Sequence, residues 1–110
     1  MKLLISGSKK ITDCDLSKYI PENTDFIITG ENKGIEAIAR KYADDNKIGK
    51  QIFISDHISF GKNAVKIRNR SMVDAADEVL IFADGKTKSS IEISNYASRK
   101  RKSVTIVFVE

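Results

Sequence analysis

The chain has 110 residues, of which 41% are hydrophobic and 31% are charged, and its formal net charge is +4. This length predicts one domain, residues 1–110, with a single modest core. Cys14 and His57 are the only cysteine and histidine, which excludes an intrachain disulfide, a thiolate metal cluster and an ordinary zinc site.

The charge and hydropathy pattern also limits the cellular location and the binding partners that we expect for the chain. The apolar run within the first ten residues is too short for a secretory signal. No apolar stretch approaches the roughly 20 residues that span a bilayer, so we expect a cytoplasmic protein with no membrane partner. The mild positive charge permits contact with phosphates without requiring nucleic acid, which we therefore expect only as a secondary partner.

Five short apolar runs follow one another along the chain and predict five strands. They are rich in Ile, Val, Leu and Phe and are mostly continuous rather than alternating. This pattern is typical of strands covered on both faces, and hence of a parallel sheet. The runs cover residues 2–6, 25–29, 51–55, 78–83 and 103–109.

Helical patterns fill the connections between these runs. Apolar residues at helical spacing predict helices over residues 33–46, 62–76 and 89–100, and one or two weaker turns around Leu16, after Asp13 or Asp15 as a cap. Strand and helix in alternation predict an α/β fold, a Rossmann-like three-layer sandwich with right-handed crossovers. Its five-stranded parallel sheet is expected in the order 3-2-1-4-5, with 2-1-3-4-5 as the alternative.

The helix predicted for residues 62–76 carries two polar residues where apolar ones are expected. On a helical wheel with about 100° per residue, Arg68 and Asn69 fall on the same face as Met72. Polar groups on a sheet-facing stripe must be hydrogen-bonded or reach an open crevice. Arg68 has the length and fork geometry to bind a phosphate or carboxylate, and Asn69 can contact a hydroxyl or a base edge. Alternatively, both satisfy loop carbonyls and acids such as Asp84.

Four loops follow the carboxyl ends of predicted strands, where ligands bind to open parallel sheets. Three of them combine glycine, hydroxyl or amide side chains, and lysine. Glycine lets backbone N–H groups approach a ligand, and the following helix N-terminus favours an anion. The loops therefore predict a phosphate-bearing ligand, unless their small polar residues simply populate turns. They cover residues 6–10, 29–34, 56–63 and 84–90.

Carboxylates at the same strand ends allow a second kind of chemistry. Two of them in one pocket can act on a ribose hydroxyl or coordinate magnesium, so magnesium is not excluded, although we predict no metal site and no resident cofactor. Alternatively, such acids are helix caps or solvated, and Glu36 only complements a helix dipole. The candidate catalytic acids for cleaving an N-glycosidic bond are Glu31, Glu36, Asp56 and Glu92.

Two sequence signatures of nucleotide binding are absent. Neither the three-glycine dinucleotide fingerprint nor the Walker A spacing occurs, which argues against ordinary dinucleotide enzymes and P-loop hydrolases.

A basic run, Arg99-Lys100-Arg101-Lys102, ends the last predicted helix, where the helix dipole favours cations. As a nucleic-acid patch the run is short and lacks flanking aromatic residues.

Several blocks of the sequence, taken together, resemble one known family. The most specific block is Arg68-Asn69-Arg70-Ser71-Met72; the others are Ile5-Ser6-Gly7-Ser8, Gly30-Glu31-Asn32-Lys33-Gly34 followed by Glu36, Gly61-Lys62-Asn63-Ala64, Ala75-Ala76-Asp77 and Asp84-Gly85-Lys86-Thr87-Lys88-Ser89-Ser90. These blocks cover nearly the whole chain. They resemble the small standalone, YspA-like members of the SLOG superfamily, which joins the DprA/SMF DNA-processing fold to the LOG phosphoribohydrolases.

The resemblance implies a Rossmann-like fold with a pocket for a nucleotide or nucleotide-derived ligand at the carboxyl edge of the sheet. It places Gly7, Ser8, Gly30, Gly34, Arg68, Asn69, Gly85 and Ser89 around that pocket, and the loops add Lys9, Asn32, Asp84 and Ser90. An apolar wall from Ile58, Phe60 and Met72 is expected to take a base.

The resemblance also orders the candidate functions. The glycine-rich signature of the LOG phosphoribohydrolases is absent, and Glu92 lies near the expected region but off the motif. We therefore expect binding, with sensing as one use of it. The alternatives are a hydrolase of N-glycosidic bonds in nucleotides and DprA-like binding of single-stranded nucleic acid. Relatives in this group commonly form dimers, so a homodimer or larger assembly is expected.

Overall fold

The structure is a computed structural model that describes residues 1–86 and 88–109, without the side chain of Ser89. Its strands are β1 (Lys2–Gly7), β2 (Phe26–Gly30), β3 (Gly49–Phe53), β4 (Glu78–Ala83) and β5 (Ser103–Phe108). Its helices are α1 (Ile35–Asp45), α2 (His57–Phe60), α3 (Ala64–Ala75) and α4 (Ser89–Arg99), with 3-10 turns η1 (Leu16–Lys18) and η2 (Gly61–Asn63).

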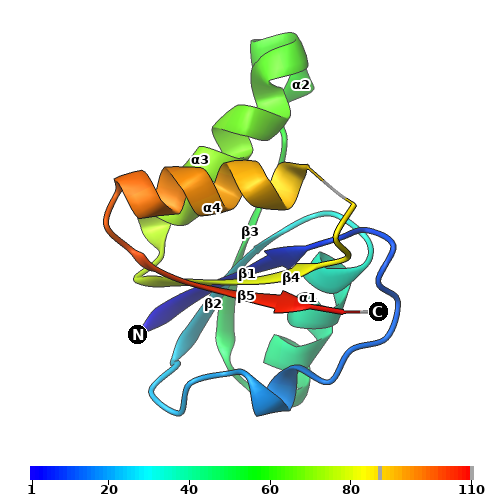
Figure 1. The fold of residues 1–110 in the computed structure, drawn as a ribbon, viewed down its shortest axis with the longest axis vertical. Coiled ribbons are helices and arrows are strands. Elements are labelled where there is room, and N and C mark those ends of the chain that lie inside the picture. Colours follow the sequence, from blue (N-terminus) through cyan, green and yellow to red (C-terminus); the bar gives the residue numbers. More distant parts are fainter. Residues whose placement is uncertain (87, 110) are drawn as a thin grey trace.

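The five strands form one parallel sheet in the order β3-β2-β1-β4-β5, which confirms the predicted order over its alternative. The chain starts in the centre at β1, builds one half through β2 and β3, and then crosses back to build β4 and β5. Helices α3 and α4 lie on one face of the sheet, and α1 and η1 lie on the other (Figure 1). The molecule is therefore the expected three-layer Rossmann-like sandwich.

Each face of the sheet has its own hydrophobic core. Under α1, buried side chains such as Ile5, Ile27 and Phe82 pack against the helix. Under α3 and α4, the alternate positions of the same strands, such as Leu4 and Ile81, do the same. Successive side chains of a strand point to opposite faces, so the three inner strands are buried on both faces, as their continuous apolar runs predict.

The edge strands depart from this expectation. Strands β3 and β5 are mostly exposed, and Ile52 and Phe108 keep 39% and 72% of their surface accessible. An edge strand has a neighbour on one side only, and the helices cover the centre of the sheet. Strand β3 also begins and ends two residues before the predicted range, because its ladder with β2 stops at the pair Gly30–Phe53.

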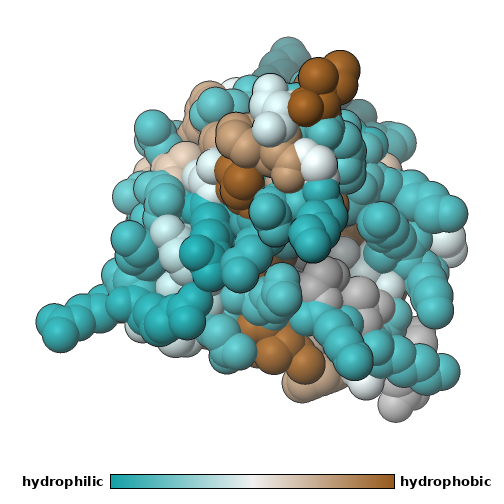
Figure 2. Space-filling view, turned by 90° about the horizontal axis from the view of Figure 1, so that it is seen from above, coloured by the Kyte–Doolittle hydropathy of each residue, from teal (hydrophilic) through white to brown (hydrophobic). Residues whose placement is uncertain are grey.

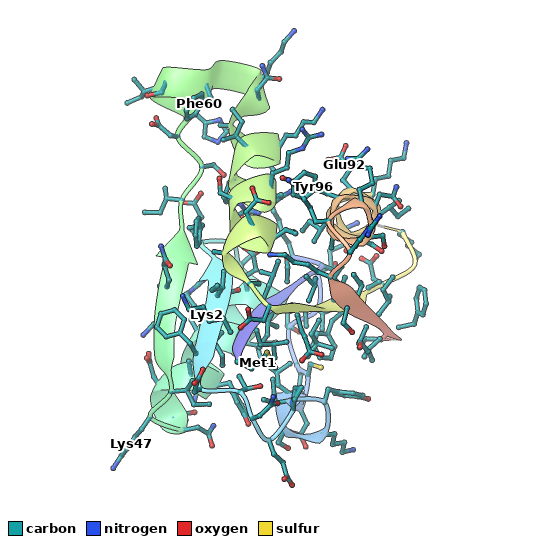
Figure 3. The ribbon with its side chains drawn as sticks, turned by 90° about the vertical axis from the view of Figure 1, so that its left-hand side faces the viewer. Met1, Lys2, Lys47, Phe60, Glu92 and Tyr96 are labelled. Atoms are coloured by element: carbon teal, nitrogen blue, oxygen red, sulfur yellow. The ribbon has the colours of Figure 1, made fainter. Side chains whose placement is uncertain are left out.

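The segment predicted as a loop over residues 56–63 is helical. Asp56 caps α2 by accepting a hydrogen bond from the Ser59 N–H at 3.0 Å, and η2 then leads into α3. α2 projects beyond the body of the molecule, with Phe60 near its far end (Figures 1 and 3).

The face of the molecule seen from above is mostly hydrophilic, and its hydrophobic residues form separate groups (Figure 2). In the described part of the chain, no helix combines the length and the apolar character needed to cross a membrane.

Lys102 is expected to stabilise the fold measurably. Its Nζ donates to the carbonyl oxygens of Val73 at 2.7 Å, Asp74 at 3.1 Å and Ala76 at 2.6 Å, which are the last carbonyls of α3. A cation at this helix end satisfies the carbonyls and complements the dipole. Lys102→Met is therefore expected to lower the free energy of unfolding by about 1–2 kcal/mol in urea denaturation. The control Lys62→Met changes an exposed lysine and should have almost no effect; equal losses would contradict the capping role.

Candidate functional site

A hollow of about 280 Å³ opens at the carboxyl end of β1. This strand lies at the point where the strand order reverses, since β2 is on one side and β4 on the other. Open α/β sheets bind ligands at such a point. The hollow is lined by Ser6, Gly7, Ser8, Lys9, Lys10, Asn32, Glu36, Val65, Arg68, Asn69 and Ile93, which come from β1, the loops after β1 and β2, and the helices α1, α3 and α4.

A buried ion pair forms one wall of the hollow. Nη1 of Arg68 lies 3.3 Å from Oε1 of Glu36, and the two side chains are 4% and 1% exposed. The Glu36 carboxylate also accepts hydrogen bonds from the Ser6 hydroxyl at 2.8 Å and from the Asn32 N–H at 3.1 Å. Glu36 is thus a central buried residue of the site, and the interpretation that it only complements the helix dipole is wrong.

Asn69 orients the other side of the Arg68 fork. Its Oδ1 accepts from Nη2 of Arg68 at 2.9 Å and from Nε at 3.3 Å. Both residues are buried on the sheet-facing side of α3, as the helical pattern predicts. The acid that neutralises Arg68 is Glu36, from the first turn of α1, and not the suggested Asp84. These described bonds use three of the five guanidinium N–H groups, and the fork borders the hollow.

Two glycines make room for this pair and for the close contact of β1 with β4. A Cβ at Gly30 would lie 2.3 Å from Oε1 of Glu36 and 2.7 Å from Nη1 of Arg68. A Cβ at Gly7 would lie 2.2 Å from the carbonyl oxygen of Phe82. Packing therefore accounts for both glycines, which the sequence also allowed as sites of ligand approach.

Ser8 ties the loop after β1 to the loop after β4. Its hydroxyl donates to Oδ2 of Asp84 at 2.7 Å and accepts from the Lys10 N–H at 3.1 Å, and its own N–H donates to the Phe82 carbonyl at 3.1 Å. Ser8 is fully buried, whereas Lys9 and Lys10 are exposed at the mouth of the hollow. The turn thus contributes two exposed lysines to the hollow that the buried Arg68 also lines.

The rest of the fourth loop lies at a different hollow. Gly85 and Ser90 line a second space of about 280 Å³ between α4 and β5, beside Ile106 and Phe108. The Ser90 hydroxyl is buried, and the described residues offer it no hydrogen-bond partner. The expected single pocket is therefore divided: Gly7, Ser8, Lys9, Asn32, Arg68 and Asn69 line one hollow, whereas Gly85 and Ser90 line another. The side chain of Ser89 lies outside the described residues.

Of the four candidate catalytic acids, only Glu36 lines the hollow at β1. Oε1 of Glu31 accepts from the Ser55 N–H at 2.7 Å and so joins the ends of β2 and β3. Asp56 caps α2, and hydrogen bonds from Ser59 lower the pKa of its carboxyl group. Glu92 lines a separate groove between α3 and α4. No group of three or more His, Cys, Asp or Glu residues suited to a metal ion occurs in the part of the chain that the structure describes.

The expected apolar wall is wrong. Met72 is fully buried in the core, while Ile58 is 100% exposed on the projecting α2. The apolar lining of the hollow comes instead from Val65 and Ile93. Val65 is four residues before Asn69, so the helical pattern already placed it near this face, but Ile93 comes from another helix. The prediction also missed Ser6 and Lys10, for which the loop composition offered a signal.

No protein-family model matches the chain, and neither a curated protein nor a solved structure matches it. A function for the chain is therefore derived from the chemistry of the hollow. That chemistry has three parts: exposed cations at the mouth, buried hydrogen-bonding groups along the wall, and a small apolar surface.

Proposed function

We propose that the chain binds a nucleoside monophosphate, or a nucleotide derivative of similar size, in the hollow at the end of β1. The observation that carries the proposal is the convergence of cationic, hydrogen-bonding and apolar groups in this one hollow. A phosphate, a ribose and a base require these three kinds of surface. The position of the hollow at the reversal of strand order is where ligands bind to sheets of this type.

Lys9 and Lys10 are the residues assigned to the phosphate. Both are exposed at the mouth, so an anion can reach their ammonium groups without crossing the core. Lysine binds phosphate as a compact point charge. The guanidinium of Arg68 is buried and paired with Glu36, which makes it a contributor to the electrostatic field and the shape of the hollow rather than a free phosphate ligand.

The remaining lining suits a nucleoside. Asn32 and Asn69 offer amide groups to ribose hydroxyls or to a base edge, and Val65, which is 41% exposed, offers an apolar surface to the base. The volume of about 280 Å³ lies just below the range of about 300–1,000 Å³ that is typical of ligand pockets. This size suits a mononucleotide and is too small to enclose a dinucleotide.

The resemblance to the SLOG superfamily is consistent with this proposal, and we propose membership in that superfamily on the sequence blocks given above. A homodimer, which the resemblance implies, and a cytoplasmic location, which the hydropathy pattern implies, remain predictions. Light scattering at several protein concentrations tests the first of these.

Calorimetric titration tests the proposed ligand class. At least one of the common nucleoside 5′-monophosphates is expected to bind, and its nucleoside is expected to bind about tenfold more weakly, since about 1.4 kcal/mol corresponds to a factor of ten. The double variant Lys9→Ala, Lys10→Ala should lower the affinity for the monophosphate to that for the nucleoside. It should leave the affinity for the nucleoside unchanged, because the lysines contact only the phosphate.

The matched control is Lys18→Ala with Lys41→Ala, which removes the same charge from exposed lysines that do not line the hollow. Monophosphates that fail to bind, or that bind equally well to both double variants, would refute the proposal.

We expect binding without cleavage of the N-glycosidic bond. The Glu36 carboxylate is the only candidate acid in the hollow, and it is already engaged by Ser6, Asn32 and Arg68. Chromatography after prolonged incubation with each bound monophosphate should therefore detect no free base. Release of base would instead support the alternative hydrolase.

A further inference from the structure

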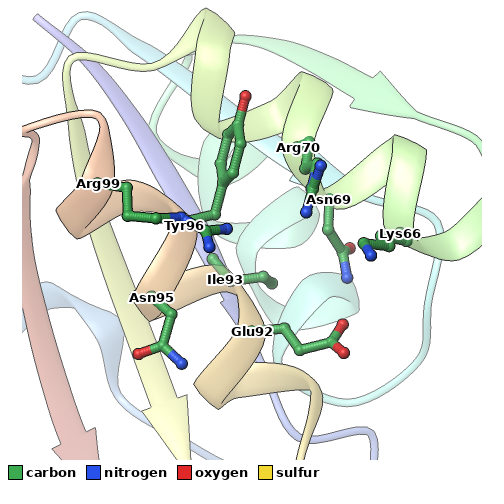
Figure 4. A pocket seen from close by; sticks show the side chains of 8 residues that line it. All are labelled: Lys66, Asn69, Arg70, Glu92, Ile93, Asn95, Tyr96 and Arg99. Carbon is green, nitrogen blue, oxygen red and sulfur yellow. The ribbon is translucent and has the colours of Figure 1, made fainter.

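A second recess lies outside the proposed nucleotide site, in the groove between α3 and α4. Its volume is about 200 Å³. Lys66, Asn69 and Arg70 come from α3, and Glu92, Ile93, Asn95, Tyr96 and Arg99 come from α4 (Figure 4). The groove adjoins the hollow at β1, since Asn69 and Ile93 line both.

Three cations gather around one aromatic ring in this groove. Cζ of Arg70 lies 5.1 Å from the centroid of the Tyr96 ring, Nζ of Lys100 lies 5.5 Å away and Cζ of Arg99 lies 5.8 Å away. The Tyr96 hydroxyl donates to Oδ1 of Asp74 at 2.8 Å, which fixes the ring. Contact with the ring face holds the cations near one another.

These cations lack carboxylate partners. Within residues 1–86 and 88–109, Lys66, Arg70, Arg99 and Lys100 form no salt bridge. Asp74, which accepts from the Tyr96 hydroxyl, and Glu92 are carboxylates beside the groove, so these four cations outnumber the two acids and repel one another. The chain has 15 acidic residues, so acids were available to the sequence. The groove is therefore suited to a partner that brings several negative charges.

The fold brings further cations and an aromatic ring close to the basic run of residues 99–102. Lys102 turns back to cap α3, but Arg99 lines the groove and Lys100 lies near the Tyr96 ring. Lys66 and Arg70 join them from α3, and Tyr96 provides the aromatic ring that does not flank the run directly. Two helices thus contribute to a basic surface that sequence adjacency alone does not reveal.

We propose that the groove between α3 and α4 binds the phosphate backbone of single-stranded nucleic acid. The guanidinium groups of Arg70 and Arg99 can each bind a phosphate in a fork geometry, and Asn95 can donate to sugar or base oxygens. A concave groove accepts a narrow strand better than a flat bilayer. Membrane-surface helices also need a large apolar face, whereas Ile93 is 3% exposed here.

Glu92 makes the two ends of the groove differ in charge. It lies seven residues before Arg99 on α4, which is about 10 Å along the helix axis. The cations around Tyr96 therefore lie at one end of the groove, and Glu92 lies at the other end, which Lys66 also lines and where the carboxylate repels phosphate (Figure 4). Glu92→Gln is expected to increase the affinity for a strand several-fold by removing this repulsion.

Fluorescence anisotropy with a labelled oligothymidine of about 20 nucleotides tests the proposal over a range of salt concentrations. The wild-type protein should bind at low salt, with an affinity that falls as salt rises. Arg70→Gln with Arg99→Gln should weaken binding about tenfold. It should also reduce the slope of log K against log salt by about 1.4, since each phosphate contact with a single strand contributes about 0.7.

The control Lys18→Gln with Lys41→Gln removes the same charge elsewhere and should change the affinity much less, because a general field effect is weak at a distance. Polyglutamate and phosphatidylserine vesicles serve as competitors. No binding at low salt, equal losses in the two double variants, or competition by polyglutamate or vesicles as strong as that by unlabelled strand would overturn the proposal. Monophosphate titration of Arg70→Gln, Arg99→Gln separates the two sites, since these residues do not line the hollow at β1.

Discussion

Arg68→Ala is expected to lower the free energy of unfolding by about 3–5 kcal/mol, because it leaves the Glu36 carboxylate buried without its counter-ion. Glu36 is 1% exposed and lies in the first turn of α1, so its charge is balanced by the Arg68 guanidinium rather than by water. The variant also deprives Oδ1 of Asn69 of its two donors. Chemical denaturation followed by circular dichroism measures the loss.

Two further variants identify the cause of that loss. Arg70→Ala removes an exposed arginine from the same helix and should cost less than about 1 kcal/mol. Arg68→Met combined with Glu36→Gln removes both charges, keeps an amide oxygen for the Asn32 N–H and offers an amide N–H to the Ser6 hydroxyl. The double variant should be more stable than Arg68→Ala, because replacing a whole buried pair costs less than breaking it. A double variant no more stable than Arg68→Ala would show that packing, not charge, holds this site.

Gly34→Ala is expected to destabilise the fold by about 3 kcal/mol or more, since it combines backbone strain with a collision. Gly34 has φ +76° and ψ −134°, a conformation that side chains disfavour. Its added Cβ would lie 2.4 Å from the carbonyl oxygen of Ser8 and 2.6 Å from Cα of Lys9. The loop after β1 would have to move, and with it the lysines assigned to the phosphate.

Gly61→Ala separates the two contributions. Gly61 also has a positive φ, +55°, but its added Cβ would meet nothing within 4 Å. This variant should therefore show only the conformational cost, about 1 kcal/mol. If Gly34→Ala destabilises the protein no more than Gly61→Ala, the close approach of the first two loops does not contribute to stability.

The glycines illustrate how the same sequence signal can have two causes. Gly7, Gly30 and Gly34 stand in loops at strand ends, and that position alone is compatible with ligand approach. In the structure, each has a neighbouring atom within 2.4 Å of the Cβ it lacks. Only coordinates reveal that neighbour, which for Gly7 and Gly34 comes from a distant segment, Phe82 and Ser8 respectively.

The sequence by itself determined the five-stranded parallel sheet and favoured its order over one alternative, which the structure then decided. The five apolar runs and the helical patterns between them are local signals, and the rules for crossover connections limit how such elements can be arranged. It also determined that Arg68 and Asn69 would lie on the buried face of α3, because a helix of 3.6 residues per turn fixes which residues share a face.

Only the tertiary structure decided what those two residues contact. Arg68 and Glu36 are 32 positions apart, and nothing in local periodicity pairs them. The division of the predicted pocket, with Gly85 and Ser90 on the far side of α4 from Arg68, arises in the same way. The convergence of Arg70 and Arg99 on Tyr96 does as well. Periodicity fixes the face on which a side chain lies, whereas its partner depends on how two packed elements meet in space.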